Sequence, residues 1–246
     1  MKSFALQKFP YSETDWIVEL FCEDNQIRKF FAHGARKSKR RFSHQFHAGG
    51  VYSIRWKKNY LESCELIDFD ESISSDLEKW TRWLCVLEWV RADEASSCQF
   101  DELLSLRTHF LKSDFYRSYF FEFFCQQIDR HGLLSELHQC RVCELSLMND
   151  SMMFSFQEGG FCHPRCGSGV AFDQDSFQFL AQLQAHQGVT ENIPETTQES
   201  LDASLLPFLE FQLGKSLRSH HFLQKILNLK QKSQEKSWQN ESSSML

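Results

Sequence analysis

The sequence contains only 4 prolines and 10 glycines among 246 residues, which excludes a collagen-like repeat and leaves little room for long flexible linkers. It also lacks any run of about 18 uncharged apolar residues, the length that a membrane-spanning helix needs. Segment 1–16 has no continuous apolar stretch, so we expect no signal peptide. What remains has an ordinary globular composition, with 41% hydrophobic and 24% charged residues.

The motifs of common enzyme classes are missing as well. The sequence has no P-loop, no His-Glu-x-x-His helix and no Gly-x-Ser-x-Gly elbow. The His-x-Glu and Pro-Cys-x-x-Cys pair of the zinc deaminases is also absent. We therefore expect a protein that is not an enzyme, and a hydrolase is the least favoured interpretation.

Charge is distributed unevenly along the chain. The formal net charge is −6, yet residues 1–60 carry +7 and residues 61–246 carry −13. Such asymmetry favours contact between the basic segment and nucleic acid, although a solvated basic surface would look the same.

The first 70 residues favour short strands. Segments 3–11, 16–22, 27–32, 51–57 and 60–69 are rich in β-branched and aromatic residues and are separated by turn residues. Five or six strands in so short a segment predict a small barrel of the OB type.

Helical periodicity takes over from Ser74, with an apolar face through Leu77, Trp80, Leu84, Leu87 and Val90. Further helices are expected over 100–111, 113–131, 173–186, 204–214 and 219–229, and a polar loop over 187–197. We thus predict an α+β protein with an OB-fold-like β-barrel (1–72), an α-helical domain (73–232) containing a four-cysteine zinc module (140–166), and a disordered tail (233–246).

Four of the nine cysteines form two close pairs. Cys140 and Cys143 are separated from Cys162 and Cys166 by an 18-residue spacer that is predicted to form a hairpin, turning at Glu158-Gly159-Gly160. Two thiolate pairs suit tetrahedral Zn²⁺, and a four-thiolate site is coordinatively closed and therefore structural. Because the second pair is C-x3-C, His163 is the alternative fourth ligand. The other five, Cys22, Cys64, Cys85, Cys98 and Cys125, are expected to be buried in a reducing compartment.

The densest cationic cluster is Arg36, Lys37, Lys39, Arg40 and Arg41. On a barrel loop it can bind backbone phosphates, and Tyr52, Trp56 or Tyr60 can stack bases. The remaining candidate DNA-binding residues lie on neighbouring strands: Arg28, Lys29, Arg55, Lys57 and Lys58.

These features together resemble the bacterial RecO family of recombination and repair mediators. The resemblance rests on Tyr11-Ser-Glu-Thr-Asp15, on Ala32-His-Gly-Ala-Arg-Lys37, on the Asp129-Arg-His-Gly-Leu-Leu segment, on the cysteine module with its Gly-Gly hairpin, and on 217–223. It spans residues 4–229. The extra residue between Cys162 and Cys166 departs from the family pattern.

The resemblance implies a cytoplasmic, nucleoid-associated protein that binds single- and double-stranded DNA and anneals complementary strands. With RecR it would help to load RecA on DNA coated by single-stranded-DNA-binding protein. The resemblance also places the cation cluster in the DNA-binding barrel and the four cysteines in a zinc module.

Two other interpretations stay open. A zinc-containing RNA-binding module would use the same barrel, and a protein–protein adaptor would use the acidic helical domain. The run Phe115, Phe120, Phe121, Phe123 and Phe124 exceeds one buried helix face. Some of these rings are therefore expected to border a docking groove for the tail of the single-stranded-DNA-binding protein, unless every ring packs in the core.

Overall fold

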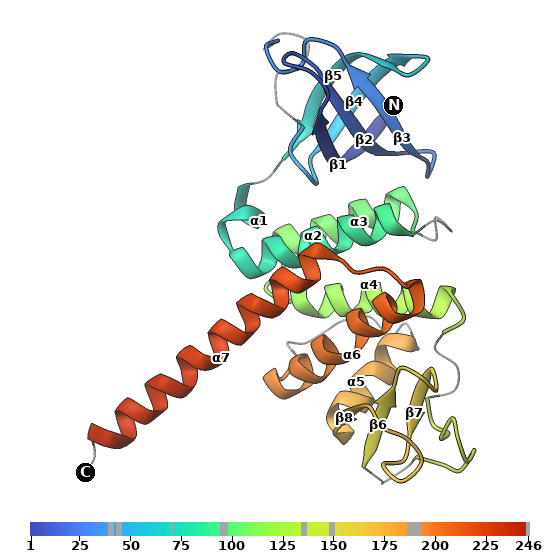
Figure 1. The fold of residues 1–246 in the computed structure, drawn as a ribbon, viewed down its shortest axis with the longest axis vertical. Coiled ribbons are helices and arrows are strands. Elements are labelled where there is room, and N and C mark those ends of the chain that lie inside the picture. The colour runs from blue at the N-terminus through green and yellow to red at the C-terminus, as the bar shows by residue number, and fades with distance from the viewer. Residues whose placement is uncertain are drawn as a thin grey trace.

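The computed structural model describes residues 1–38, 42, 46–69, 71–93, 98–133, 137–147, 151–185 and 193–244. A β-barrel lies at one end of a helical body, and a small three-stranded sheet lies at the other end (Figure 1). No helix in these ranges is long and apolar enough to cross a membrane.

Five strands close the barrel in the order β1-β2-β3-β5-β4. All neighbouring strands run antiparallel except β3 and β5, which are parallel. This arrangement confirms the expected OB-like barrel. The strands are β1 (Lys2–Pro10), β2 (Trp16–Cys22), β3 (Ile27–Ala32), β4 (Val51–Lys57) and β5 (Tyr60–Asp68).

The helical body begins directly after the barrel. Asp76 caps α2 by accepting a hydrogen bond from the Lys79 amide (3.0 Å), and Asp173 caps α5 through Ser176 (2.7 Å). The helices are α1 (Glu71–Ser75), α2 (Leu77–Ala92), α3 (Phe100–Lys112), α4 (Tyr116–Arg130), α5 (Gln174–Gln184), α6 (Glu195–Leu213) and α7 (Arg218–Ser244). The strands β6 (Met152–Ser155), β7 (Gly160–Cys162) and β8 (Val170–Phe172) form the second sheet, in the order β7-β6-β8.

Helix α4 is surrounded by α2, α3, α5 and α6. Phe120, Phe121, Phe123 and Phe124 are all at most 3% exposed. The expectation that some rings of this run border an open groove is therefore wrong for these four. The expectation assumed that the helix buries only one face. A helix that is packed on several sides can instead be apolar around its whole circumference.

The start of α6, the end of α7 and the buried face of α2 also differ from the sequence expectation. Helix α6 begins at Glu195, inside the expected polar loop, because Pro194 precedes the first turn and Leu201 is already buried. Helix α7 continues to Ser244, past the expected end at residue 229. In α2, Leu77 is 54% exposed, whereas Trp83 and Trp89 are buried.

The barrel packs firmly on the helical body. The Asn25 side chain in the β2–β3 turn accepts a hydrogen bond from the Phe100 amide (2.7 Å) and donates to Gln99 Oε1 (2.6 Å). A Cβ at Gly49 (φ 75°) would lie 2.1 Å from Trp83 Nε1, so only glycine allows this approach. Buried residues of the barrel, including Phe4 and Phe21, share one hydrophobic core with α2 and α3.

Candidate metal centre and nucleic-acid interface

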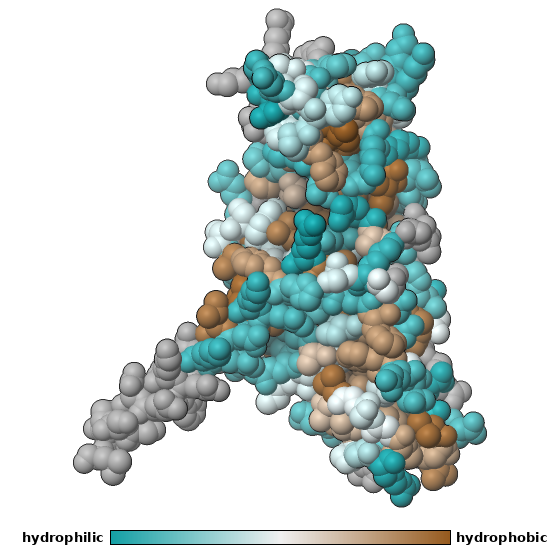
Figure 2. Space-filling view, in the orientation of Figure 1, coloured by the Kyte–Doolittle hydropathy of each residue, from teal (hydrophilic) through white to brown (hydrophobic). Residues whose placement is uncertain are grey.

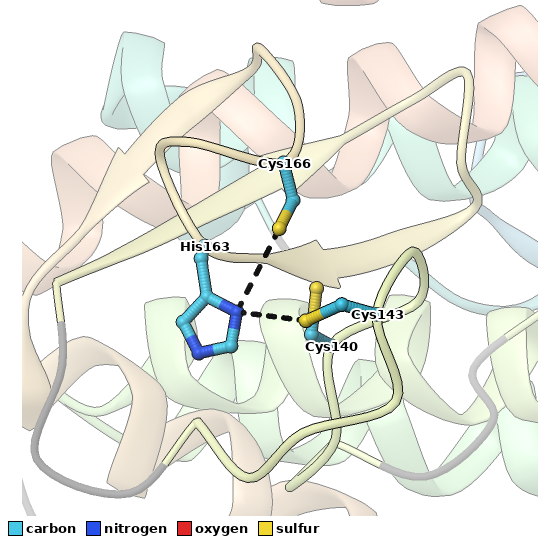
Figure 3. Close-up of side chains that lie close together, drawn as sticks. All are labelled: Cys140, Cys143, His163 and Cys166. Atoms are coloured by element: carbon cyan, nitrogen blue, oxygen red, sulfur yellow. Dashed lines mark hydrogen bonds between the residues drawn. The ribbon is translucent and has the colours of Figure 1, made fainter.

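The cysteine module brings together three sulfurs and one imidazole (Figure 3). The ligand atoms of Cys140, Cys143, His163 and Cys166 all lie within 4.8 Å of one another. His163 Nδ1 is 3.4 Å from Cys143 Sγ and 4.0 Å from Cys166 Sγ. Ligands around a tetrahedral zinc are roughly 3.5–3.8 Å apart. The cluster could therefore hold a metal ion.

Two tight turns present these ligands. In the first, the Glu144 amide donates to the Cys140 carbonyl (2.9 Å), and Glu144 itself adopts φ 60°. In the second, the Cys166 amide donates to the His163 carbonyl (2.8 Å). Each turn places its two side chains on the same side of the backbone, as paired metal ligands require.

The structure selects His163, the alternative ligand, in place of Cys162. Cys162 ends strand β7, and its Sγ faces the Met153 carbonyl of β6 at 3.6 Å. A Cβ at Gly167 would lie 2.8 Å from this sulfur, which shows how closely it is enclosed. Because side chains alternate along a strand, the residue after Cys162 turns to the other side and reaches the cluster.

The surroundings of the cluster favour ligation. Burial raises the pKa of the Cys140 thiol, but the backbone amides of Cys143, His163 and Val142 outweigh it and lower the pKa to about 6. His163 is 4% exposed, and its Nε2 lies 3.2 Å from the Ser146 carbonyl. Such a contact fixes the ring orientation and leaves Nδ1 for the metal. The three sulfurs and one nitrogen would fill the four positions of a tetrahedral ion and leave no position open for a substrate.

The remaining five cysteines behave as expected. Cys22, Cys64, Cys85, Cys98 and Cys125 are all buried and free.

The second candidate site is the end of the barrel that faces away from the helical body, here called the distal end. It consists of the β1–β2 turn (11–15), the segment after β3 (33–38) and the β4–β5 turn (57–60). The β2–β3 turn, which binds α3 through Asn25, lies at the opposite end of β2. The Phe31 amide donates to the Asn59 carbonyl (2.8 Å) and joins the β4–β5 turn to the end of β3.

Asp15 holds the segment after β3 against the β1–β2 turn. Its carboxylate accepts hydrogen bonds from the Gly34 amide (2.8 Å) and the Thr14 hydroxyl (2.9 Å), and lies 3.1 Å from His33 Nδ1. The Gly34 amide is the main cause that lowers the pKa of Asp15 to about 2. Arg36 links the same two segments, because its guanidinium donates a hydrogen bond to the Ser12 carbonyl (2.6 Å).

The structure describes seven of the ten predicted DNA-binding residues and separates these seven into two groups. Arg36, Lys37, Lys57 and Lys58 are exposed at the distal end. Lys39, Arg40 and Arg41 lie outside the described residues.

The other three predicted cations already have protein partners. Arg28 forms a two-pronged pair with Asp24 at 2.6 and 2.7 Å, near the helical body. Lys29 lies 3.5 Å from Glu19, and Arg55 donates to Ser63 Oγ (3.1 Å). These partners reduce the positive charge that Arg28 and Lys29 offer to DNA.

The predicted stacking residues also differ in exposure. Tyr52 is fully buried and its hydroxyl accepts a hydrogen bond from the His47 amide, so its assignment to base stacking is wrong. Its place on the inner face of β4 explains the burial. Trp56 and Tyr60 are 37% and 50% exposed, respectively.

Sequence reasoning missed two aromatic residues beside the β1–β2 turn. Tyr11 is 62% exposed. The Trp16 ring has the Lys8 ammonium 5.1 Å and the Arg36 guanidinium 5.3 Å from its centroid. Their position next to a turn-forming Ser-Glu-Thr-Asp segment was visible in the sequence, but the contact with Arg36 arises only from barrel closure.

Comparison with known protein families gives a match to the barrel. Residues 1–69 match the family model described as "Recombination protein O N terminal". A search of curated proteins finds no match. The matched range covers the five-stranded barrel and ends just before α1.

Proposed function

We propose that the chain, whose residues 1–69 match the N-terminal domain of recombination protein O, belongs to that family and is a mediator of DNA repair and recombination. In this proposal it binds single- and double-stranded DNA and anneals complementary strands. With RecR it helps to load RecA on DNA coated by single-stranded-DNA-binding protein, in the bacterial cytoplasm at the nucleoid.

The observation that carries the proposal is the distal end of the matched barrel. Four exposed cations surround its turns: Arg36, Lys37, Lys57 and Lys58. Cations on an OB-like barrel bind phosphates without reading the base sequence, which suits a protein that acts at any site in a genome. Annealing needs only that the repulsion between two strands is neutralised while their bases remain free to pair. No bond is made or broken, so the proposed activity is not enzymatic.

For the cluster of three cysteines and one histidine we propose one structural Zn²⁺, which suits three thiolates and one imidazole. Cys140, Cys143, His163 and Cys166 would hold it. The ion would join the 140–147 turn to the β6–β7 hairpin and so hold the small sheet together, far from the barrel (Figure 1).

An annealing assay tests the proposed function. Complementary oligonucleotides are coated with single-stranded-DNA-binding protein, and duplex formation is followed with and without the full chain. We expect the chain to accelerate annealing and to retain this effect with mixed sequences. A chain that binds neither strand at low salt and leaves the annealing rate unchanged would refute the proposal. Preferential binding of RNA would instead support the RNA-binding alternative.

A further inference from the structure

The two half-buried cysteines of the chain lie next to each other in the candidate metal centre. All nine cysteines belong to the described residues, and seven of them are buried. The two that solvent reaches are Cys143 and Cys166, which come from the two different turns of the cluster (Figure 3). Their sulfurs are at most 4.8 Å apart, and both lie within 4.0 Å of His163 Nδ1. The accessible thiols of this protein are therefore also neighbours.

The cluster lies where a small solute can reach it. The small sheet forms the end of the molecule opposite the barrel (Figure 1), and Figure 2 shows hydrophilic and hydrophobic side chains together on the surface of this end. In the turn that carries Cys143, Val142 is 46% exposed and Leu145 is 57% exposed. This turn is therefore part of the surface and is not covered by a helix.

The other two sulfurs of the module are shielded from solvent. Cys140 is 1% exposed, and Cys162 is fully buried. The Cys162 sulfur lies 3.6 Å from the Met153 carbonyl, and a Cβ at Gly167 would approach this sulfur to 2.8 Å. A reactive solute that reaches the module therefore meets Cys143 and Cys166 first.

We propose that Cys143 and Cys166 are a peroxide-sensitive pair, which forms a disulfide and thereby releases the structural metal ion. This inference rests on the zinc centre of the proposed function. The first thiolate attacks the peroxide, the O–O bond breaks, and a sulfenic acid and a hydroxide form. The second thiolate attacks the oxidised sulfur, so that the S–S bond forms and a second hydroxide leaves. Two electrons pass from the sulfurs to the peroxide, and the hydroxides take up two protons and become water.

The disulfide replaces one link between the turns by another. After oxidation Cys140 and His163 remain as ligands, and two ligands are too few for a closed tetrahedral site. The S–S bond joins the same two turns that the ion would join. It also closes the loop from residue 143 to residue 166, and closing a loop restricts the unfolded chain and so stabilises the fold. The small sheet should therefore stay closed after the ion has left.

The test uses the full-length protein with its zinc bound. Hydrogen peroxide is added in small excess, and zinc release is followed with a chromogenic chelator. Free thiols are then blocked, and peptide mapping by mass spectrometry identifies the disulfide. We expect about one zinc to be released per chain and two of the nine thiols to be lost. The joined peptides should contain Cys143 and Cys166, and dithiothreitol with added zinc should restore the original state.

A comparison of two zinc-free forms isolates the effect of the disulfide. The peroxide-treated protein has the disulfide, whereas protein stripped by a chelator under reducing conditions lacks it. We expect the oxidised form to melt at the higher temperature. Cys162→Ala is the matched control, because it removes a thiol of the same module and should leave zinc release and the disulfide unchanged. Cys166→Ser should form no disulfide between the two turns.

The contrary results are specific. A disulfide between Cys140 and Cys143, a pair that ends as sulfinic acids, or survival of all nine thiols would refute the inference. Loss of the disulfide in Cys162→Ala would show that the wrong sulfur was assigned. Equal melting of the two zinc-free forms would show that the disulfide does not hold the sheet. If the purified protein contains no zinc but the disulfide forms, the zinc proposal fails and the peroxide-sensitive pair stands. None of these readouts involves DNA, so they are independent of the barrel.

Discussion

The cations of the distal end allow a direct electrostatic test of DNA binding. Lys37→Glu together with Lys58→Glu removes two of the four exposed cations that the described part of the chain places there. Neither side chain makes an ion pair among the described residues, so the fold should be retained. Lys112→Glu together with Lys225→Glu is the matched control, because both residues are exposed on the helical body and make no ion pair among the described residues. Each substitution lowers the net charge by two, so both variants change from −6 to −10.

The magnitude follows from counterion release. Each phosphate contact to a single strand contributes about −0.7 to the slope of log affinity against log salt. Four contacts give a slope of about −2.8, so wild-type affinity falls about 50-fold between 50 and 200 mM salt. The distal variant keeps two contacts, and its affinity should fall only about 7-fold over the same range. The control variant should keep the wild-type slope.

Fluorescence anisotropy with a fluorescein-labelled oligothymidine of about 16 nucleotides, measured at four or more salt concentrations, provides these slopes. Thermal melting of each variant shows whether the fold is retained. If the distal and control variants have the same slope, DNA does not bind at the distal end. If both variants match the wild type in slope and affinity, the cations of the barrel are only solvated surface.

Two further predictions concern the metal centre and the barrel contact. His163→Ala should lower bound zinc well below one per chain in metal analysis of protein purified without chelator, whereas Cys162→Ala should retain it; the reverse result would restore the four-cysteine set. Gly49→Ala should destabilise the protein by about 1–3 kcal/mol, seen as a fall in melting temperature, because the new methyl group meets Trp83. Gly34→Ala is its control, since Gly34 has a similar φ of 68° but open space around it, and an equal loss in both variants would show that backbone strain alone is responsible.

The barrel was predictable because its signal is local. Each strand appears as a run of β-branched and aromatic residues bounded by turn residues, and all five observed strands agree with the predicted segments to within one or two residues. The OB-like barrel that these segments predict is confirmed by the closed five-stranded barrel. What periodicity could not supply was which aromatic side chains of β4 point inward, and Tyr52 was misassigned for that reason.

The helical body was harder to predict because its contacts are long-range. Arg82 in α2 is fully buried, and its guanidinium binds Asp202 in α6 at 2.7 and 2.8 Å. It also donates to Glu78 at 3.1 Å. A sequence pattern assigns such an arginine to the solvent side, because arginine is rarely buried unless it is paired. The partner lies 120 residues away, and only the fold brings it close.

The candidate metal ligands show the same difference: one part of the site follows from local sequence and the other part depends on the fold. The C-x2-C turn was recognisable from spacing, whereas the choice between Cys162 and His163 depends on the register of β6 and β7. Met153 pairs with Cys162 in that hairpin, which directs the sulfur into the sheet. A sequence argument could identify both candidates but could not choose between them.

The acidic net charge of the chain is compatible with DNA binding because the opposing charges are separated in space. The distal end lies one strand length from the helical body, and β2 with its seven residues spans about 20 Å. The Debye length at physiological salt is about 8 Å, so the acidic body is screened from a strand bound at the distal end. The firm contact at Gly49 and Asn25 preserves this separation, because it keeps the distal end turned away from the helices. The charge within one Debye length of the bound phosphates therefore determines binding. At the distal end, the described residues Arg36, Lys37, Lys57 and Lys58 outnumber the acids Glu13 and Asp15.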